Sequence, residues 1–231
     1  MFLTVKEIAK AIDLSCVRTT SNVKDIDEMV EAACKYGFGQ VSVLQCFIPY
    51  TRQLLKNASH VKVVGNVSFP SGSDSTSVKV IQAREMVAAG CDEIDMVMNI
   101  GQLRSGEFEK VKKDIREVIE IVRPIPVKVI IEIMYLTTEE TEQACSICVH
   151  AGADFVKTGT GWANRGTTLD DVRLVKSFVG NRIKIKASGG IRDLDMLVKM
   201  YKAGARRFGV NLKSGVKIVE EALLLESGIK V

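Results

Sequence analysis

Short apolar runs alternate with longer amphipathic segments along almost the whole chain. A short apolar run bounded by turn residues is typical of a buried strand, whereas apolar residues at helical spacing predict an α-helix. Strands are predicted near residues 8–14, 40–44, 61–67, 93–98, 127–132, 155–157, 183–186 and 207–210. Helices are predicted near residues 50–56, 75–89, 106–122, 138–151, 168–178, 194–203 and 216–225. This alternation predicts an α/β protein with a parallel sheet.

A glycine turn recurs where three of the predicted helices give way to strands. Ala-Ala-Gly-Cys-Asp-Glu, Ala-Gly-Ala-Asp-Phe and Ala-Gly-Ala-Arg-Arg precede the strands near residues 93, 155 and 207. Glycine is the usual residue at the left-handed position that ends a helix. Eight strands built from this repeated unit favour a (β/α)8 TIM barrel over an open doubly wound sheet, because no Gly-X-Gly-X-X-Gly follows the first strand. No linker interrupts the pattern, so residues 1–231 are expected to form one domain.

Composition excludes several classes of partner. The chain has 231 residues, 46% of them hydrophobic, and a net charge of +4 with dispersed basic residues, so nucleic acid is not an expected partner. No apolar run approaches the length of a membrane span, so no membrane partner is expected either. Residues 1–10 lack the apolar stretch of a signal peptide, which makes the cytoplasm the expected location.

The cysteines and histidines do not form a recognisable ligand set. Six cysteines occur, and Cys145 and Cys148 have Cys-X-X-Cys spacing. A metal or redox site would need a second ligand pair or a thioredoxin-like context, and the two histidines, His60 and His150, are far apart in sequence. We therefore expect small buried helix residues at the cysteine positions, with no metal and no cofactor.

Two lysines end short apolar strands, and each is followed by a glycine turn. Lys157 precedes Thr-Gly-Thr-Gly, and Lys186 precedes Ala-Ser-Gly-Gly. A lysine is costly to bury unless its charge is used or its pKa falls. A neutral lysine amine attacks a carbonyl to form an imine, and a second ammonium nearby lowers the pKa of the first. The pair therefore predicts an imine-forming nucleophile with a charged neighbour.

Strand alternation predicts which polar side chains join these lysines inside the barrel. Ile94 and Met96 share one face of their strand, so Asp95 is expected on the opposite, inward face, where it could shuttle protons to the reacting carbon. Lys128 and Glu132 share a face and are expected to form a structural ion pair. The full set expected inside the barrel is Asp95, Lys128, Glu132, Lys157, Lys184 and Lys186.

The loops after the last two strands predict an anion site. Gly189-Gly190-Ile191-Arg192 follows the seventh strand, and Gly209-Val210-Asn211 ends the eighth. In TIM barrels these two loops commonly hold phosphate through backbone N–H groups and a helix N-terminus. A small phosphorylated substrate is therefore expected.

Four motifs together resemble deoxyribose-phosphate aldolase, in the order and spacing of that family, over nearly the whole chain. They are Glu93-Ile94-Asp95-Met96-Val97, Val129-Ile130-Ile131-Glu132, Asp154-Phe155-Val156-Lys157-Thr158 and Lys186-Ala187-Ser188-Gly189-Gly190-Ile191-Arg192. The resemblance implies a metal-free class I aldolase that reversibly cleaves 2-deoxyribose 5-phosphate to glyceraldehyde 3-phosphate and acetaldehyde, and it implies a homodimer. It places the Schiff base on Lys157 and the proton relay on Asp95 and Lys186. The implied phosphate contacts are Gly161, Gly189, Gly190, Arg192 and Gly209.

Several positions depart from the family pattern. Gly159 replaces a serine, Ile133-Met134 replaces Thr-Gly, and Lys184 replaces a glycine. After Gly209 two phosphate-binding hydroxyls are missing, and Asn211, Lys213 or Ser214 is expected to substitute for them. Two alternatives therefore stay open: a related imine-forming aldolase with another aldehyde acceptor, and a non-catalytic barrel that binds a sugar phosphate.

Overall fold

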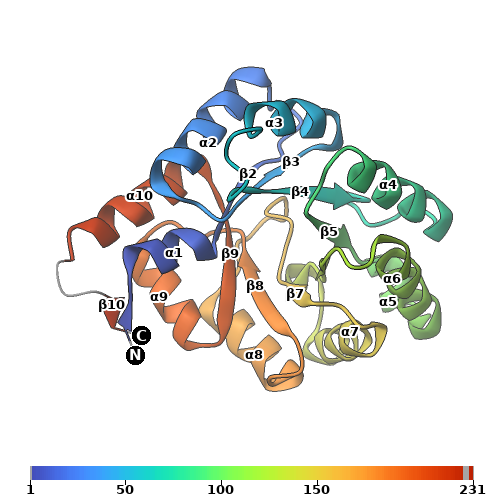
Figure 1. Ribbon diagram of the computed structural model, residues 1–231. Helices are drawn as coiled ribbons and strands as arrows, with labels where there is room; N and C mark the ends of the chain where they lie inside the picture. Colours follow the sequence, from blue (N-terminus) through green and yellow to red (C-terminus); the bar gives the residue numbers. More distant parts are fainter. Residues whose placement is uncertain (1, 226–228, 231) are drawn as a thin grey trace.

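The computed structural model describes residues 2–225 and 229–230 and has a closed barrel of eight parallel strands at its centre (Figure 1). Each strand pairs with its neighbours in sequence, and the last pairs with the first. The strands are β2 (Ile12–Cys16), β3 (Gln40–Val43), β4 (Lys62–Val67), β5 (Glu93–Val97), β6 (Val127–Ile130), β7 (Phe155–Lys157), β8 (Lys184–Ser188) and β9 (Ala205–Asn211). The TIM barrel expected from the sequence is confirmed.

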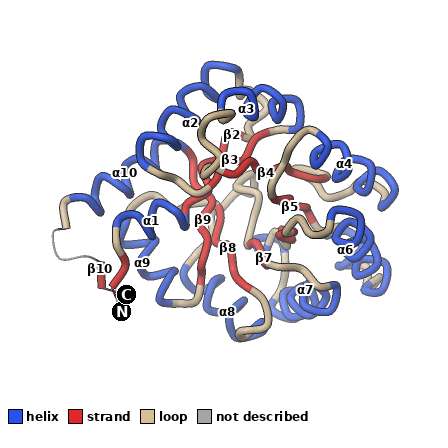
Figure 2. Tube along the Cα trace, in the orientation of Figure 1, coloured by secondary structure: helices blue, strands red, loops and turns tan. Residues whose placement is uncertain are grey.

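Helices surround the strands, as the blue and red segments of Figure 2 show. They are α1 (Val5–Ala11), α2 (Val23–Tyr36), α3 (Ile48–Leu54), α4 (Thr76–Ala88), α5 (Ile100–Arg104), α6 (Phe108–Val122), α7 (Thr138–Ala151), α8 (Leu169–Val179), α9 (Leu194–Lys202) and α10 (Leu212–Leu223). Two 3-10 turns, η1 (Gln45–Phe47) and η2 (Ile133–Tyr135), follow β3 and β6. Outside the barrel, β1 (Phe2–Leu3) pairs antiparallel with β10 (Ile229–Lys230), so the two ends of the chain lie together.

The predicted strand at residues 8–14 is wrong over its first half. Ile8 belongs to α1, whose start is fixed by a capping box in which Thr4 and Glu7 each accept a backbone N–H of the other. The strand begins only at Ile12.

Two other helix starts are also set by side-chain caps that hydrophobic spacing does not reveal. Helix α2, missing from the predicted elements, starts with a capping box between Asn22 and Asp25. Helix α10 starts at Leu212 rather than at residue 216, because Asn211 Oδ1 accepts the backbone N–H of Ser214 at 2.9 Å.

The recurring glycine turns are confirmed. Gly90, Gly152 and Gly204 have φ angles of 103°, 84° and 118°, a region that side chains disfavour. The aspartate two residues after each of the first two glycines accepts a backbone N–H of the neighbouring strand: Asp92 from Val63 at 2.8 Å and Asp154 from Val127 at 2.9 Å. The repeated turn thus ends a helix and also fixes the start of an adjacent strand.

The apolar core lies between the barrel and its helices. Ile94 and Met96 on β5 are fully buried on the side opposite Asp95, and the apolar faces of α4 and α6 pack against each other. In the described part of the chain, no helix has the length and apolar character needed to cross a bilayer.

One ion pair is buried in this core. Lys79 on α4 has a fully buried side chain, and its ammonium lies 2.6 Å from Asp114 on α6 and donates to the Val97 carbonyl at 3.1 Å. Lys79 thereby joins two helices to the end of the strand that carries Asp95. A buried pair is strongly destabilising when one partner is removed, because the other charge is left without compensation.

We expect Lys79→Met to lower the free energy of unfolding by roughly 3–5 kcal/mol, because it leaves the Asp114 carboxylate buried and unpaired. Urea denaturation at neutral pH measures this loss. The double variant Lys79→Met/Asp114→Leu should recover most of the lost stability, and equal losses in the single and double variants would contradict the assignment.

Candidate active site

The predicted Lys157, Asp95 and Lys186 meet inside the barrel. Asp95 lies on β5 with no exposed surface, and its Oδ2 accepts from Lys157 Nζ on β7 and Lys186 Nζ on β8, each at 2.8 Å. Lys157 and Lys186 are register partners on adjacent strands. One carboxylate oxygen therefore holds both ammonium groups close together.

Further charges continue this cluster toward the N-terminal ends of the strands. Lys128 Nζ lies 2.9 Å from Asp95 Oδ1 and 2.6 Å from Glu93 Oε2, and Lys186 Nζ lies 2.6 Å from Asp13 Oδ2. Arg207 lies 3.5 Å from Asp13 and 3.6 Å from Glu93.

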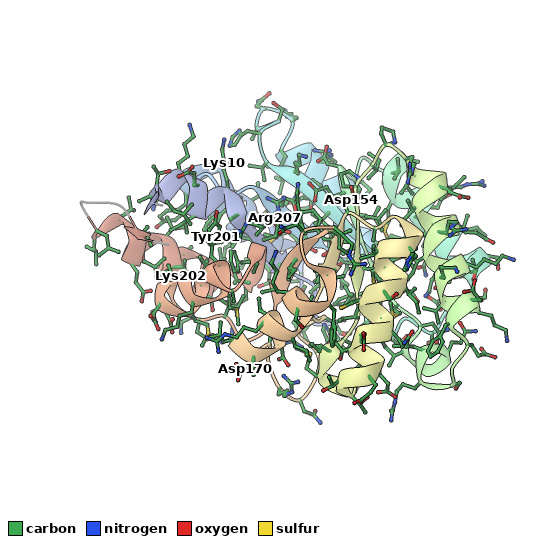
Figure 3. The ribbon with its side chains drawn as sticks, turned by 90° about the horizontal axis from the view of Figure 1, so that it is seen from below. Lys10, Asp154, Asp170, Tyr201, Lys202 and Arg207 are labelled. Atoms are coloured by element: carbon green, nitrogen blue, oxygen red, sulfur yellow. The ribbon has the colours of Figure 1, made fainter. Side chains whose placement is uncertain are left out.

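Arg207 also closes this lower end of the cluster against α1. Its Nη1 donates to the Lys10 carbonyl at 2.8 Å, and both residues are labelled in Figure 3. We call the seven charged residues the interior ion cluster: Asp13, Glu93, Asp95, Lys128, Lys157, Lys186 and Arg207.

The interior ion cluster contains one more cation than anions. Three carboxylates face three lysines and one arginine, so one positive charge has no counter-charge inside the cluster. Lys157 carries the largest exposed side-chain fraction of the three lysines, 6% against 0% for Lys128 and 1% for Lys186. It also contacts only one carboxylate, whereas each of the other two lysines contacts two. Lys157 is therefore the lysine whose proton is easiest to lose.

The pKa of Lys157 agrees with this charge count. Burial, together with the positive charges of Lys186 and Lys128, lowers the pKa of Lys157 to about 8, although Asp95 opposes the shift. About a tenth of such an amine is neutral at pH 7, against roughly one part in 3,000 for an ordinary lysine. The cluster thus supplies a nucleophilic amine near neutral pH.

The neighbours of Lys157 stay charged. Burial alone would raise the pKa of Asp95, but Lys128, Lys157 and Lys186 outweigh it and hold that pKa well below its usual range. Burial would likewise lower the pKa of Lys128, but Asp95, Asp13 and Glu93 raise it above the ordinary value. Asp95 is therefore an ionised carboxylate between ammonium groups.

Two residues expected inside the barrel are elsewhere. Lys184 is exposed at the first position of β8, where its ammonium lies 5.5 Å from the centre of the Phe155 ring, so it is not an inward amine. The expected ion pair between Lys128 and Glu132 is also wrong. Glu132 follows the end of β6 with φ of 48°, and its carboxylate accepts the Thr160 backbone N–H at 3.0 Å and hydroxyl at 2.6 Å. Glu132 therefore fixes the loop that follows Lys157.

Two departures from the family pattern meet in this loop. A Cβ added to Gly159 would lie 2.9 Å from both Glu132 Oε1 and Met134 Cε, closer than real side chains allow. The Met134 side chain thus fills the space that a larger residue at position 159 would need. The two changes compensate for each other, although they are far apart in the sequence.

A cavity lies beyond the lysines at the C-terminal ends of the strands. Thr160 and Ser188, which follow Lys157 and Lys186 in the chain, are part of its wall. All six expected phosphate-binding residues line it: Gly161, Gly189, Gly190, Arg192, Gly209 and Asn211. The structure brings these residues together, and their contact with phosphate stays a prediction.

The candidates for the missing hydroxyls do not all face this cavity. Asn211 lines it, but its side-chain oxygen is used as the cap of α10. Ser214 and Lys213 line a neighbouring cavity, and Ser214 Oγ contacts Arg192 Nη1 at 3.4 Å.

Sequence reasoning missed Arg18 and Trp162, which also line the phosphate-side cavity. Both lie in loops after strands, where no hydrophobic spacing marks a residue. The available signal was position, because functional side chains of TIM barrels stand in the loops at the C-terminal ends of the strands.

The Cys-X-X-Cys residues are helix residues, as expected, but the same expectation is wrong for Cys34 and Cys46, which are exposed, and for Cys16, which lies on β2. Cys145 and Cys148 are buried on α7 as free thiols. Burial raises the pKa of Cys145 to about 12 and that of Cys148 well above its usual value. These thiols therefore stay protonated and apolar in character.

Comparison with known proteins assigns the family. Residues 7–218 match the model of the DeoC/LacD family aldolases. The chain belongs to this aldolase family. It is 44% identical over 218 residues to a deoxyribose-phosphate aldolase of Carboxydothermus hydrogenoformans, covering 93% of this chain and 94% of that one. It is 39% identical over 226 residues to a deoxyribose-phosphate aldolase of Rhizobium meliloti, covering 98% and 91%.

Solved structures agree with this family assignment. QR15, an aldolase, superposes with a TM-score of 0.88 at 40% identity, covering 94% of this chain and 96% of that one. Deoxyribose phosphate aldolase from Aeropyrum pernix superposes with a TM-score of 0.86 at 27% identity, covering 94% and 92%. The aldolase fold thus extends over nearly the whole chain.

We expect Lys128→Met to shift the midpoint of the pH profile of Lys157 reactivity to higher pH, on the order of one pH unit. The substitution removes a cation and leaves Lys157 as a counter-charge for Asp95, so the pKa of Lys157 rises. The measurement is the rate of borohydride-trapped aldehyde adduct formation on Lys157 between pH 6 and pH 10.

Two further variants control this experiment. Asp13→Asn removes a carboxylate from the interior ion cluster and should shift the profile in the opposite direction. Lys184→Met removes an exposed lysine from the same barrel and should leave the profile in place. Shifts of the same sign in Lys128→Met and Asp13→Asn would contradict the charge-balance explanation.

We expect Lys157→Met to stabilise the fold at pH 7 by about 1–3 kcal/mol, because the pKa of Lys157 falls from 10.5 to about 8 on folding. The unfolded chain binds more protons between these two values, so the wild type gains stability as the pH rises through this window. The variant therefore exceeds the wild type in unfolding free energy by the full amount below pH 8, and this difference shrinks toward pH 10.5. Thermal unfolding at pH 7 and pH 10 measures it, and a variant less stable than the wild type at pH 7 would refute the prediction.

Proposed function

We propose that the protein is a class I deoxyribose-phosphate aldolase, an aldehyde-lyase that reversibly cleaves 2-deoxy-D-ribose 5-phosphate to D-glyceraldehyde 3-phosphate and acetaldehyde. The observation that supports this most directly is the buried Lys157, with a pKa of about 8, on a strand whose following loop forms part of the wall of a glycine-lined cavity. Relatives with about 40% identity over nearly the full chain carry this activity as their name.

Lys157 is the residue that forms the covalent intermediate. Its neutral amine adds to the C1 aldehyde of the open-chain sugar, and loss of water gives a protonated imine. The C3 hydroxyl then passes its proton to the relay of Asp95 and Lys186, the C2–C3 bond breaks, and the electron pair of this bond moves to the iminium to form an enamine. Glyceraldehyde 3-phosphate leaves at this point. Protonation of the enamine at C2 and hydrolysis of the imine release acetaldehyde and restore the amine.

Lys186 and Asp95 supply the protons for these steps. Lys186 Nζ and Lys157 Nζ both contact Asp95 Oδ2, so a proton of Lys186 reaches the reacting nitrogen through a single carboxylate oxygen. The low pKa of Asp95 suits a group that passes a proton on and does not store it. Asp13 and Asp95 both contact Lys186 Nζ and hold it beside the reacting amine.

The glycine-lined cavity is the site for the 5-phosphate. Backbone N–H groups of glycine turns at the ends of barrel strands, together with Arg192, provide donors for a phosphate dianion. A homodimer and a cytoplasmic location, both expected from the sequence, stay predictions; light scattering of the purified protein tests the first.

The proposal is tested by trapping the imine. The protein is incubated with deoxyribose 5-phosphate or with acetaldehyde, reduced with borohydride and analysed by peptide mass spectrometry, with product release measured in parallel. An adduct on Lys157 and cleavage of the sugar phosphate are expected. An acetaldehyde adduct without cleavage of deoxyribose 5-phosphate would favour a related aldolase with another acceptor. No adduct with any aldehyde would rule out both aldolases and favour a non-catalytic barrel.

We expect Lys157→Ala to lose turnover by several orders of magnitude, because the variant lacks the amine that forms the imine. Circular dichroism should show an intact barrel, since Asp95 keeps its contacts with Lys128 and Lys186. Lys184→Ala serves as the matched lysine control and should retain turnover. Retained turnover in Lys157→Ala would move the nucleophile to another lysine.

A further inference from the structure

Arg18 extends from the loop after β2 to the edge of the phosphate-side cavity. Its guanidinium lies 5.2 Å from the centre of the Trp162 ring, and its Nη2 donates to the Gly161 carbonyl at 2.8 Å. Trp162 packs edge-on against Phe69 of the loop after β4, with ring centres 6.2 Å apart. Three loops thus meet at the mouth of the barrel, and the Arg18 guanidinium is held by the loop that carries Gly161 and Trp162.

The charge of Arg18 has no carboxylate partner in residues 2–225 and 229–230. No carboxylate of this part lies within 4 Å of its guanidinium, and the same is true of Arg192, which lines the same cavity. Arg165, in the loop that also carries Trp162, shows the contrast, because two of its nitrogens contact the Asp171 carboxylate. Two unpaired guanidinium groups therefore flank one glycine-lined cavity.

The end of β9 adds one side-chain amide to this cavity. Val210 is apolar, and Asn211 uses its side-chain oxygen to cap α10, which leaves its amide nitrogen as a donor; Lys213 lines the neighbouring cavity. An anion in the cavity would therefore meet backbone N–H groups, the Asn211 amide group and the two arginines.

We propose that Arg18 binds the phosphate monoester of the substrate together with Arg192, and that Trp162 positions Arg18 for this contact. The inference rests on the proposed aldolase function and adds a specificity-determining residue to it. A guanidinium presents several N–H donors in a planar fork that matches phosphate oxygens, and only one of these donors, on Nη2, is used by Gly161. Stacking on an indole limits the positions that the arginine side chain can adopt, which lowers the entropy cost of holding the phosphate.

The test compares a phosphorylated and an unphosphorylated substrate. kcat/KM is measured for deoxyribose 5-phosphate and for 2-deoxyribose, and the ratio of the two is the readout. Arg18→Gln should lower this ratio roughly 10- to 100-fold, mainly through KM for the phosphorylated sugar, with 2-deoxyribose cleavage unchanged. Arg18→Lys keeps the charge without the fork and should fall between the wild type and Arg18→Gln.

Lys24→Met is the matched charge control. Lys24 lies on the adjacent helix α2 with an 84% exposed side chain, and its loss changes the net charge by the same unit. The ratio of the two kcat/KM values in Lys24→Met should equal that of the wild type. An unchanged ratio in Arg18→Gln, or equal losses for both sugars, would overturn the role of Arg18 in phosphate binding.

Trp162 is tested by a double-mutant cycle on the same ratio. Trp162→Ala should lower the ratio, Trp162→Phe should preserve most of it, and Trp162→Ala/Arg18→Gln should lose no more than Arg18→Gln alone. Additive losses would overturn the positioning role, because they would mean that Trp162 acts independently of Arg18.

A direct binding measurement separates this inference from the proposed function. Calorimetry with inorganic phosphate should show binding weakened by a similar factor in Arg18→Gln, and equal affinity would overturn the inference whatever turnover shows. The acetaldehyde adduct on Lys157 should form equally in the wild type and in Arg18→Gln. Its absence from the wild type would refute the aldolase reaction while leaving the phosphate measurement valid.

Discussion

The charge balance of the interior ion cluster is the constraint on which the site depends. Charges removed from water are tolerated only in well-paired networks, and here three carboxylates face four cations across six strands of the barrel. The surplus positive charge is relieved most easily at Lys157, which has one carboxylate contact and the most exposed position among the three lysines. The neutral amine needed for imine chemistry is therefore a property of the whole cluster, to which Lys128 and Asp13 contribute as well as the nearest neighbours.

The sequence predicted the fold and the central lysine pair because both depend on simple periodicities. Strand alternation placed Asp95 on the same side as Lys157 and Lys186, and the structure joins them at 2.8 Å. Alternation predicts which face of a strand a residue is on, but not how far along the barrel axis it lies. It therefore wrongly predicted Lys184 inside the barrel, although this residue is the exposed first position of β8. It also failed at Glu132, where the strand has already ended and a left-handed backbone turns the side chain toward Thr160.

The remaining features depend on contacts between distant segments, which no local pattern reports. Lys79 and Asp114 come from different helices, and each alone reads as an ordinary charge on an amphipathic helix. In the sequence, Gly159 and Met134 are two separate departures from the family pattern. In the structure, the Met134 side chain occupies the space that a side chain at position 159 would need. The loop after Lys157 is fixed despite these two changes in side-chain size, because Glu132 accepts two hydrogen bonds from Thr160.

The two ends of the barrel differ on either side of the interior ion cluster. At the N-terminal ends of the strands, Arg207 contacts Asp13, Glu93 and the Lys10 carbonyl and covers the network from below (Figure 3). At the C-terminal ends, the cavity that begins at Thr160 and Ser188 leads out past Arg18 and Trp162. The residues that can recognise the phosphate therefore lie beyond the C-terminal ends of the strands that carry Lys157 and Lys186. Recognition and chemistry are stacked along the barrel axis, so a change in the outer loops can alter which aldehyde enters while the pKa of Lys157 stays set by the cluster beneath it.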